Sequence, residues 1–416
     1  MKHAHEGFQR LKNVDAALAR FLQSARRPFV EAEWLLVSRA LERILAEDIV
    51  AESEIPHSDR SIVDGFAVKS SDTNRASQVS PLILKIMGES RLGEPCRGVV
   101  RSGGAFAIAT GSIVPKGADC IVPVEDLRKM SGGRIAVTET VERGQNVLRK
   151  GEDIVPGKVV LTKGRRLRSE DLGVLKVLGI KRVRVMKRPR VAILSTGNEL
   201  VDSPPSRSSS RIVDINRLVL SGKVRQLGGT VIDFGIVKDR KGLIIRALEK
   251  AVNSSDMVLV SGGSSVGQKD LVPSCINAVG KPGMLVHGVA MRPAMPTGLA
   301  SVDGVPIISL PGFPVSAMFA FLIFGAPMIA KLSGGKSLPK ARLQARTSEP
   351  IKGVKGYRTF VRVALRRTKR GFTARPVDSQ RASVMMSIVA ADGFVVVPEK
   401  TGIIPKESLV DVTLLT

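Results

Sequence analysis

Cysteine, histidine and aromatic residues are scarce in this 416-residue chain, and each shortage excludes a class of protein. The three cysteines, Cys96, Cys120 and Cys275, are far apart and odd in number, so the sequence has neither a disulfide framework nor the paired spacing of a zinc site. The four histidines include no metal-ligand pair apart from His3 and His5, which we interpret as part of a frayed terminus. Aromatic residues make up 4%, too few for the stacking platforms of single-stranded nucleic-acid binding.

Long apolar runs are also missing. The longest nearly unbroken one, Val315–Ala330, is short for a membrane span and contains Gly325 and Pro327, so we predict a buried helix. The first residues carry charges with no apolar segment behind them, which is not the pattern of a secretory signal. These two observations predict a cytoplasmic protein that does not enter the membrane.

Acidic residues are few relative to basic ones. The chain has 64 Lys and Arg against 38 Asp and Glu, a formal net charge of +26. Such a field attracts nucleic acid, anionic membranes or polyphosphorylated ligands. The basic residues are spread along the chain, however, and the densest cluster, Arg366–Arg370, has the pattern of a hairpin turn. We therefore interpret most of this charge as solvated surface and do not expect a nucleic-acid partner.

The most informative stretch that is present is Asp256–Asp270. Met257–Val260 is a short apolar run typical of a buried parallel strand, and it leads directly into a segment rich in glycine and serine. Two adjacent glycines, Gly262 and Gly263, allow the backbone to approach a ligand closely. Exposed N–H groups and the hydroxyls of flanking serines, including Ser261 and Ser265, suit a phosphate. Asp270 ends the segment with a carboxylate that suits a metal ion beside that phosphate.

Strand and helix patterns alternate from about Arg190 to Leu332. The alternation predicts a parallel sheet with helices on both faces, and ligands of such sheets bind at the carboxyl ends of the strands. The residues that fall just past predicted strand ends are Thr196, Gly197, Glu199, Asp239, Ser261–Asp270, Pro311, Gly312 and Ser316. We expect these residues to converge although they are far apart in the sequence.

The fold class we predict is a multidomain α/β protein with a three-layer α/β domain. The N-terminal segment has helical patterns at Val14–Leu22 and Glu33–Ile44, with Trp34 expected in the core. Short apolar runs separated by glycine predict an inserted β domain, and alternation after residue 340 predicts a C-terminal β barrel or sandwich. The expected domains are 1–54 with 142–185, then 55–141, 186–333 and 336–416.

Six stretches resemble, in order, the motifs of the molybdopterin molybdenumtransferases, the family that includes the C-terminal domain of gephyrin. They are Ser61–Val68 (SIVDGFAV), Thr110–Val122 (TGSIVPKGADCIV), Gly151–Ile154 (GEDI), Ser195–Leu200 (STGNEL), Ser261–Asp270 (SGGSSVGQKD) and Leu310–Ser316 (LPGFPVS). The resemblance extends from about Ala16 to the C-terminus.

This resemblance implies insertion of molybdate into adenylated molybdopterin, with release of AMP. It implies catalytic roles for Asp64, Asp153, Glu199 and Asp270, and a cleft completed between the subunits of a homodimer. Cleavage of a phosphoanhydride needs charge neutralisation, and Mg²⁺ prefers one or two carboxylates together with substrate phosphate and water, which Asp239 and Asp270 would supply. Thr110 is a further candidate for contact with the substrate. Without the resemblance, Asp64-Gly65 is a plain turn signal and Thr110 suits a turn or cap equally well.

The sequence departs from the family in places that handle the oxoanion. The family's K-P-G-K-P appears as Arg292-Pro-Ala-Met-Pro, so that Arg292 keeps one cation and Met295 removes another. The family's Q-x-S appears as Gln380-Arg-Ala, with Ser383 one position later. Near Asp64, valine and phenylalanine replace the family's methionine and tyrosine.

Three alternatives remain open at this point. The first is a paralogue that binds adenylated molybdopterin without completing metal transfer, or that prefers tungstate. The second is a serine hydrolase, because residues 263–267 fit G-x-S-x-G and are followed by Asp270 and His287. The third, suggested only by the charge, is a nucleic-acid-binding protein.

Overall fold

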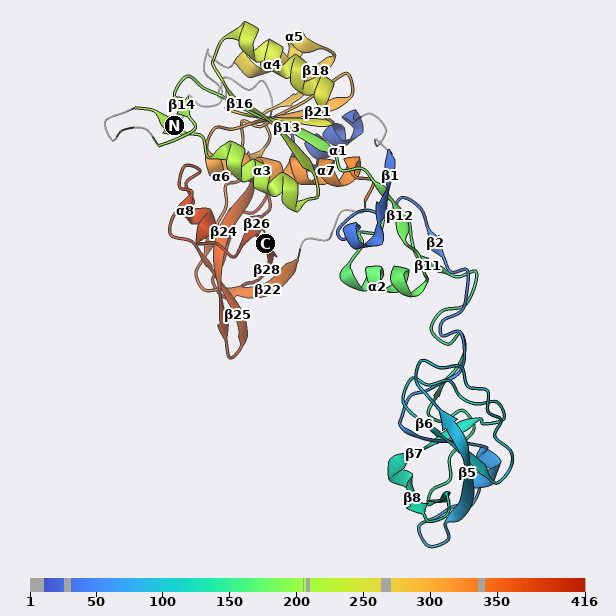
Figure 1. Cartoon of the computed structure of the whole chain (residues 1–416). Helices are drawn as coiled ribbons and strands as arrows, with labels where there is room; N and C mark the ends of the chain where they lie inside the picture. The colour runs from blue at the N-terminus through green and yellow to red at the C-terminus, as the bar shows by residue number, and fades with distance from the viewer. Residues whose placement is uncertain are drawn as a thin grey trace.

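In the computed structural model, residues 11–25, 31–204, 206, 210–262, 271–335 and 341–415 are described. Figure 1 shows an elongated molecule with a layered α/β part at one end and a separate β sheet at the other. A barrel lies beside the α/β part, and a narrow stalk made of two segments of the chain leads to the distant sheet. We retain the four domain ranges given above as a proposed division of the chain.

The α/β part is built on a six-stranded sheet with the order β16-β13-β17-β21-β20-β18. Four neighbouring strands are parallel, and two antiparallel strands extend one edge. The parallel strands are β16 (Thr230–Val237), β13 (Arg190–Thr196), β17 (Met257–Ser261) and β21 (Val305–Leu310), and the others are β20 (Gly298–Val302) and β18 (Pro282–His287).

Helices cover both faces of this sheet, as the alternating sequence pattern predicts. One face packs against α1 (Val14–Ser24), α3 (Asn216–Gln226) and the helical segment 314–332. The opposite face packs against α4 (Lys241–Ser254) and α5 (Leu271–Val279). The three-layer α/β arrangement is therefore confirmed.

The segment 314–332 consists of α6 (Pro314–Ala320), a π-helical turn at Phe321–Gly325 and α7 (Ala326–Leu332). Among the described residues it is the one helix long and apolar enough to cross a membrane, with a mean hydropathy of 1.9. In its most apolar window, 67% is buried inside the protein, because the helix packs against the sheet and α1. The prediction of a buried helix over Val315–Ala330 is confirmed.

One helix prediction near the N-terminus is wrong. Residues predicted as a helix over Glu33–Ile44 form strand β1 (Ala32–Leu36) and the 3₁₀ turn Val37–Arg39. β1 pairs antiparallel with β12 (Arg182–Met186), and the Trp34 side chain is 58% exposed rather than part of the core. A short apolar run fits either structure, and a strand partner that lies far away in the sequence decided the outcome.

The segment Ser169–Leu178 (SEDLGVLKVL) predicts a helix with Ser169 as its cap and Gly179 at its end, and helix α2 (Ser169–Val177) lies there with a small shift at its start. Arg168 is the cap residue and Ser169 is the first helical residue, whereas the sequence predicted Ser169 as the cap. The Asp171 carboxylate accepts a hydrogen bond from the Arg168 N–H at 3.0 Å and therefore satisfies one free donor of the first turn. Gly179 follows the helix with a φ of +74° and ends it as expected.

The inserted sheet has the order β7-β4-β6-β5-β9-β8. Its strands are β7 (Cys120–Pro123), β4 (Gly65–Val68), β6 (Gly104–Ile108), β5 (Leu82–Ser90), β9 (Arg134–Val137) and β8 (Leu127–Met130). They contain the apolar runs that predict strands in the sequence, namely Leu82–Ile86, Ala105–Ile108, Cys120–Pro123 and Ile135–Val137. The stalk consists of two antiparallel chain segments. They pair through β2 (Ile49–Val50) with β11 (Val159–Leu161) and through β3 (Arg60–Ser61) with β10 (Val147–Leu148).

The C-terminal part is a closed barrel of five strands. In order around the barrel they are β24 (Arg358–Thr368), β25 (Gly371–Pro376), β22 (Arg342–Thr347), β28 (Leu409–Leu414) and β26 (Gly393–Val397), which pairs again with β24. The predicted turn at Arg366–Arg370 joins β24 to β25. Phe319 of α6 packs on Phe360 and Phe394 of the barrel, with ring centroids 5.5 and 5.3 Å away, and ties the barrel to the α/β part.

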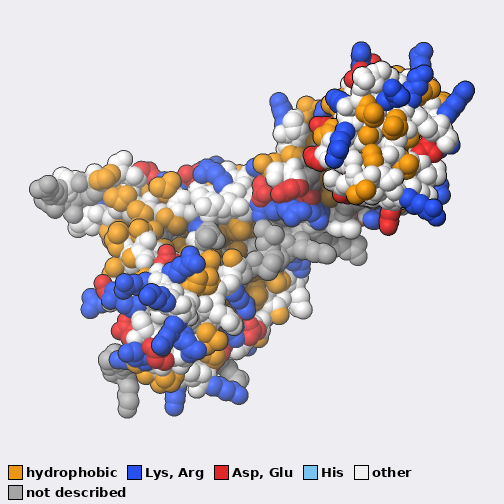
Figure 2. Space-filling model, turned by 90° about the horizontal axis from the view of Figure 1, so that it is seen from below, with side chains coloured by type: hydrophobic (Ala, Val, Ile, Leu, Met, Phe, Trp, Pro, Cys, Tyr) orange, Lys and Arg blue, Asp and Glu red, His pale blue; other side chains and the backbone are white. Residues whose placement is uncertain are grey.

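Basic side chains do not gather in one stripe on the face shown in Figure 2. Lys and Arg lie on the barrel, along the middle of the molecule and on the inserted sheet, with acidic and apolar side chains between them. This distribution fits the interpretation of the charge as solvated surface.

Candidate functional site

The carboxyl ends of the parallel strands bring together most of the predicted ligand-binding residues that lie on this sheet. Gly262, which follows β17, donates its N–H to the carbonyl of Leu310 at the end of β21 at 3.1 Å. Gly197, which follows β13, donates to the carbonyl of Val237 at the end of β16 at 3.3 Å. The ends of four strands therefore form one edge, as ligand sites of such sheets require.

Gly262 is the tightest point of this edge. Its φ is +93°, and a Cβ atom there would lie 2.4 Å from the carbonyl oxygen of Thr196. A residue with a side chain would be strained in this conformation and would collide with backbone, so glycine is required. Because glycine has no side chain, the backbone at the end of β17 can approach a ligand closely.

Two hydroxyls at the end of β13 are buried without a partner. Neither Ser195 Oγ nor Thr196 Oγ1 makes a hydrogen bond within the described part of the chain, although both side chains are almost fully buried. Buried polar groups are rarely left unpaired, and each exception in a folded protein asks for an explanation. A ligand at this edge would supply a hydrogen-bond partner for the hydroxyl of Thr196, a residue that the sequence predicts as a substrate contact.

Asn216 joins two of the strand ends and was not predicted as a site residue. It is the first residue of α3, it is buried, and its Nδ2 donates to Ser261 Oγ and to the carbonyl of Gly312, both at 2.8 Å. The amide thus holds the segments after β17 and β21 at a fixed spacing. The available signal was a polar side chain at a helix start, directly behind the carboxyl edge of the sheet.

Asp239 and Glu199 lie at the same edge. Asn198 and Asp239 exchange hydrogen bonds, each backbone N–H donating to the other's side-chain oxygen at 3.2 Å. The Glu199 carboxylate folds over Gly197, where an added Cβ would lie 2.8 Å from Glu199 Oε1. Asp270, Gly263 and Ser265 lie outside the described residues, so their predicted roles stay predictions.

Within the described ranges, no three His, Cys, Asp or Glu side chains are grouped to hold a metal ion. A Mg²⁺ ion that binds a phosphate ester needs only one or two protein carboxylates, since phosphate oxygens and water complete its coordination. Asp239 Oδ2 accepts from Asn198, and no donor to Oδ1 is found in the described structure. The donor set around Asp239 therefore fits a Mg²⁺ ion that is held jointly with a substrate.

Asp64 and Thr110 meet on the inserted sheet. Thr110 donates both its backbone N–H and its hydroxyl to Asp64 Oδ1, at 2.7 and 2.9 Å. These two hydrogen bonds, the backbone one first, hold the pKa of the Asp64 carboxyl below its ordinary value of 3.8. Asp153 lies on the stalk, where its N–H donates to the carbonyl of Ile55 at 3.1 Å. Figure 1 shows this group well separated from the sheet edge that carries Asp239 in the same chain.

Replacing Thr110 by valine is expected to raise the pKa of Asp64 while keeping it below the ordinary value. Valine loses the hydroxyl donor but keeps the backbone N–H, which is the larger of the two causes. Because the pKa is lowered in the folded state, ionised Asp64 favours folding above its ordinary pKa, and this contribution disappears as the pH falls through the lowered value. A carboxyl-carbon NMR titration of Asp64 measures the shift, with Thr110→Ser as the control that keeps the hydroxyl. An unchanged pKa in Thr110→Val would show that the hydroxyl contact does not persist in solution.

A cavity of about 470 Å³ between the α/β part and the barrel joins the two motifs that depart from the family. Arg292, Met295 and Ser316 line it from one side, and Gln380 and Ala382 line it from the other. The Arg292 guanidinium lies over the ring of Tyr357, 4.8 Å from the ring centroid. Arg292 and Ser316, both predicted as substrate contacts, therefore share one pocket. Met295 lines the same pocket, so a cation at position 295 would face it.

Arg362 is a buried cation beside this cavity, and no sequence motif predicts it. Its side chain is 0% exposed, and its Nη2 donates to the carbonyls of Ser379 and Arg381 at 3.2 and 3.5 Å. Gln380 brackets the same residue, because it accepts from the Arg362 N–H and donates to the Arg362 carbonyl. Burial lowers the pKa of the Arg362 guanidinium to about 10, so it stays charged at neutral pH and fixes the loop that carries Gln380.

Comparisons with known proteins agree over nearly the whole chain. Family profiles match the MoeA N-terminal region (domain I and II) over residues 12–179, a probable molybdopterin binding domain over 192–331 and the MoeA C-terminal region (domain IV) over 344–415. A molybdopterin molybdenumtransferase of Haemophilus influenzae is 31% identical over 391 residues, which cover 94% of this chain and 95% of that protein. Another, from Staphylococcus epidermidis, is 29% identical over 91% of this chain and 90% of its own length.

The fold is similar to that of a crystal structure of the molybdopterin biosynthesis MoeA protein from Pyrococcus horikoshii OT3. The TM-score is 0.86 and the identity 31%, with 97% of this chain and 100% of that chain covered. The order and the spacing of the motifs, the multidomain fold and the near-complete coverage point to the same assignment. The chain therefore belongs to the molybdopterin molybdenumtransferase family and is a transferase of molybdenum cofactor biosynthesis.

Proposed function

We propose that this chain inserts molybdate into adenylated molybdopterin and releases AMP in a Mg²⁺-dependent reaction. The observation that carries the proposal is the single sheet edge at which Gly262, Asn216 and Asp239 meet. The glycine backbone at Gly262 and the nearby serine hydroxyls suit the phosphates of the substrate. The carboxylate of Asp239 suits the ion that would neutralise those phosphates, and Asp270 stays the predicted second ligand.

Each residue at the sheet edge has a proposed role that follows from its chemistry. When bound at Asp239, Mg²⁺ would supply a Lewis acid for the phosphoanhydride oxygens. Asn216 keeps the two phosphate-facing segments at their spacing, so the cradle is ordered before substrate arrives. Glu199, folded over Gly197, orients the pterin or a water molecule in our proposal.

The proposal includes a homodimer in which each cleft takes Asp64, Thr110 and Asp153 from the second subunit. What supports it is the separation within one chain, where the inserted sheet lies at the opposite end of the molecule from the edge that carries Asp239. A second copy related by a twofold axis can bring an inserted sheet to that edge, since twofold pairing exchanges equivalent parts between subunits.

Release of AMP from adenylated molybdopterin, measured with molybdate, with tungstate and with neither, tests the proposed reaction. We expect release that depends on Mg²⁺ and on an oxoanion. Binding of the adenylated cofactor without any AMP release would favour the paralogue that only binds. That second candidate is kept because Met295 and Ala382, two residues of the 470 Å³ cavity, both depart from the family. The serine-hydrolase motif at 263–267 lies outside the described residues.

Met295→Lys is expected to tighten molybdate binding about tenfold or more. The residue lines the same cavity as Arg292, and a single charged hydrogen bond contributes roughly 1.5–3 kcal/mol. Equilibrium binding of radiolabelled molybdate measures the change. Met295→Leu, which keeps the size and the neutrality, serves as the matched control and should leave the affinity as it is. Equal affinities in Met295→Lys and Met295→Leu would place the oxoanion elsewhere.

A further inference from the structure

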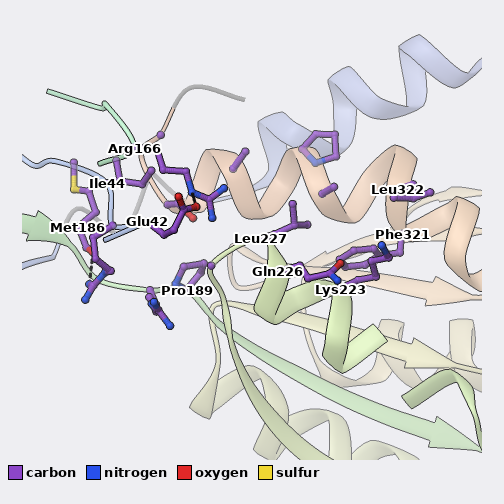
Figure 3. A pocket seen from close by; sticks show the side chains of 18 of the residues that line it. Glu42, Ile44, Arg166, Met186, Pro189, Lys223, Gln226, Leu227, Phe321 and Leu322 are labelled. Atoms are coloured by element: carbon purple, nitrogen blue, oxygen red, sulfur yellow. Dashed lines mark hydrogen bonds and ion pairs between the residues drawn. The ribbon is translucent and has the colours of Figure 1, made fainter. Parts of the chain in front are cut away.

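Among the described residues, the helix 314–332 has one apolar face that is only partly buried. Leu322, Ala326 and Ala330 are each only half-buried, and they follow one another at helical spacing on this face. They line a cavity of about 620 Å³, the junction cavity, which lies where the first part of the chain, the α/β part and the barrel meet. Figure 3 shows this helix on one side, the end of α3 with Lys223 and Leu227 opposite, and Arg166 with Glu42 at the far end.

The cavity wall is strongly basic above this apolar floor. Of the described residues that line it, five are cations, Arg43, Arg166, Lys187, Arg188 and Lys223, and one, Glu42, carries a carboxylate. Three of the cations are paired, since Arg43 lies 2.6 Å from Glu33, Lys187 2.6 Å from Glu31 and Arg166 2.7 Å from Glu42. For Arg188 and Lys223 we find no ion pair or side-chain hydrogen bond within the described ranges.

We propose that the junction cavity binds a small amphipathic organic anion, with an apolar body and one anionic head group. The volume falls within the roughly 300–1,000 Å³ of small-molecule sites. The half-buried apolar face of the helix would cover the body of the ligand, and Lys223 and Arg188 would meet its charge. Because neither has an ion-pair partner in the part of the chain that the structure describes, contact with an anion breaks no pair found there.

This site is separate from the one at the strand ends. Helix α3 carries Asn216 at its first turn and Lys223 in its last turn, and the helix rises about 10 Å from one residue to the other. A ligand in the junction cavity would therefore not overlap a substrate at the sheet edge. It would instead touch three parts of the fold at once, so binding should raise the thermal stability of the whole chain.

The fluorescent probe 8-anilinonaphthalene-1-sulfonate has the required chemistry, and N-phenyl-1-naphthylamine has the same rings without the charge. With the full-length protein, Lys223→Glu is expected to weaken sulfonate binding about tenfold or more and to leave the neutral probe unaffected. The matched control is Arg225→Glu, an exposed position on the same helix that does not line the cavity and changes the net charge equally. It should leave both affinities within about twofold, because exposed charges outside the site are screened.

A second variant tests the apolar floor. Ala330→Phe places a ring in the cavity and is expected to abolish binding of both probes, with Ala326→Leu as the substitute if Ala330→Phe does not fold. Equal weakening by Lys223→Glu and Arg225→Glu would mean that the general positive charge holds the sulfonate, and would overturn the proposal. So would retained probe binding in the floor variants, or a floor variant that halves the molar mass in light scattering, since the face would then be an interface between copies.

Discussion

Replacing Asp239 by asparagine is expected to slow AMP release about 100-fold at saturating substrate, with little loss of stability. Asparagine keeps the size of the side chain and an oxygen that can accept the Asn198 N–H at 3.2 Å, but it removes the charge that would hold Mg²⁺. A Lewis-acid contact contributes several kcal/mol to a barrier, and a 100-fold change corresponds to about 2.7 kcal/mol. Single-turnover rates over a series of Mg²⁺ concentrations measure the effect.

The matched control is Asp303→Asn. Asp303 is exposed in the turn between β20 and β21, with a φ of +51° that asparagine tolerates well. The Asp303→Asn variant should release AMP at the same rate as the unmodified chain. If Asp239→Asn also did so at low Mg²⁺, the metal would have to be held without this carboxylate.

The same variant tests whether the cleft is shared between subunits. When Asp239→Asn chains are refolded with Asp64→Asn chains, half of the dimers carry one copy of each. A shared cleft gives each such dimer one site with both changes and one with neither, so about a quarter of the unmodified activity returns. If both aspartates act within one chain, every site keeps one defect and mixing restores nothing.

Gly262→Ala is expected to destabilise the chain by about 2–4 kcal/mol and to remove measurable affinity for the nucleotide-pterin substrate. The methyl group would lie 2.4 Å from the Thr196 carbonyl oxygen in a backbone of φ +93°, so β13 and β17 must separate at the edge where we propose that the substrate binds. Denaturant unfolding gives the stability, and calorimetry with an adenylated pterin gives the affinity.

Gly173→Ala provides the comparison for this substitution. Gly173 lies inside α2 with no atom within 4 Å of an added Cβ, so alanine should stabilise the chain by about 0.5–1 kcal/mol. Wild-type stability in Gly262→Ala would mean that the edge relaxes without cost. Lost stability with intact affinity would place the phosphate contacts away from this turn.

Physical reasons separate the parts of the fold that the sequence predicts from those it does not. Strands β13, β17 and β21 are buried on both faces, so each contains a short continuous apolar run. Their alternation with helices leaves few possible arrangements of the chain. Residues 32–36 form a strand because they pair with residues 182–186, with Trp34 opposite Arg184. No local sequence pattern reveals a pairing partner so far away in the chain.

The candidate site divides in a similar way. Gly197, Gly262 and Gly312 are predictable because strand ends of a parallel sheet share one edge. The bridge formed by Asn216 depends on the positions of two other segments, and the buried Arg362 depends on a loop of the barrel. Asp64 and Thr110 are each predicted from their motifs, but their direct hydrogen bonds require the pairing of β4 with β6.

The stalk makes the inserted sheet an exchangeable cassette. Ile55 and Ile154 donate to each other's carbonyls at 2.8 and 3.0 Å, so the chain leaves and rejoins the body at adjacent points. Removal of the 98 residues between them would leave two ends that a short turn can close, while the α/β part and the barrel keep all their own strand pairs. Recombination between relatives can therefore replace Asp64 and Thr110 together, as one block, and alter one side of the proposed shared cleft without disturbing the residues at the sheet edge.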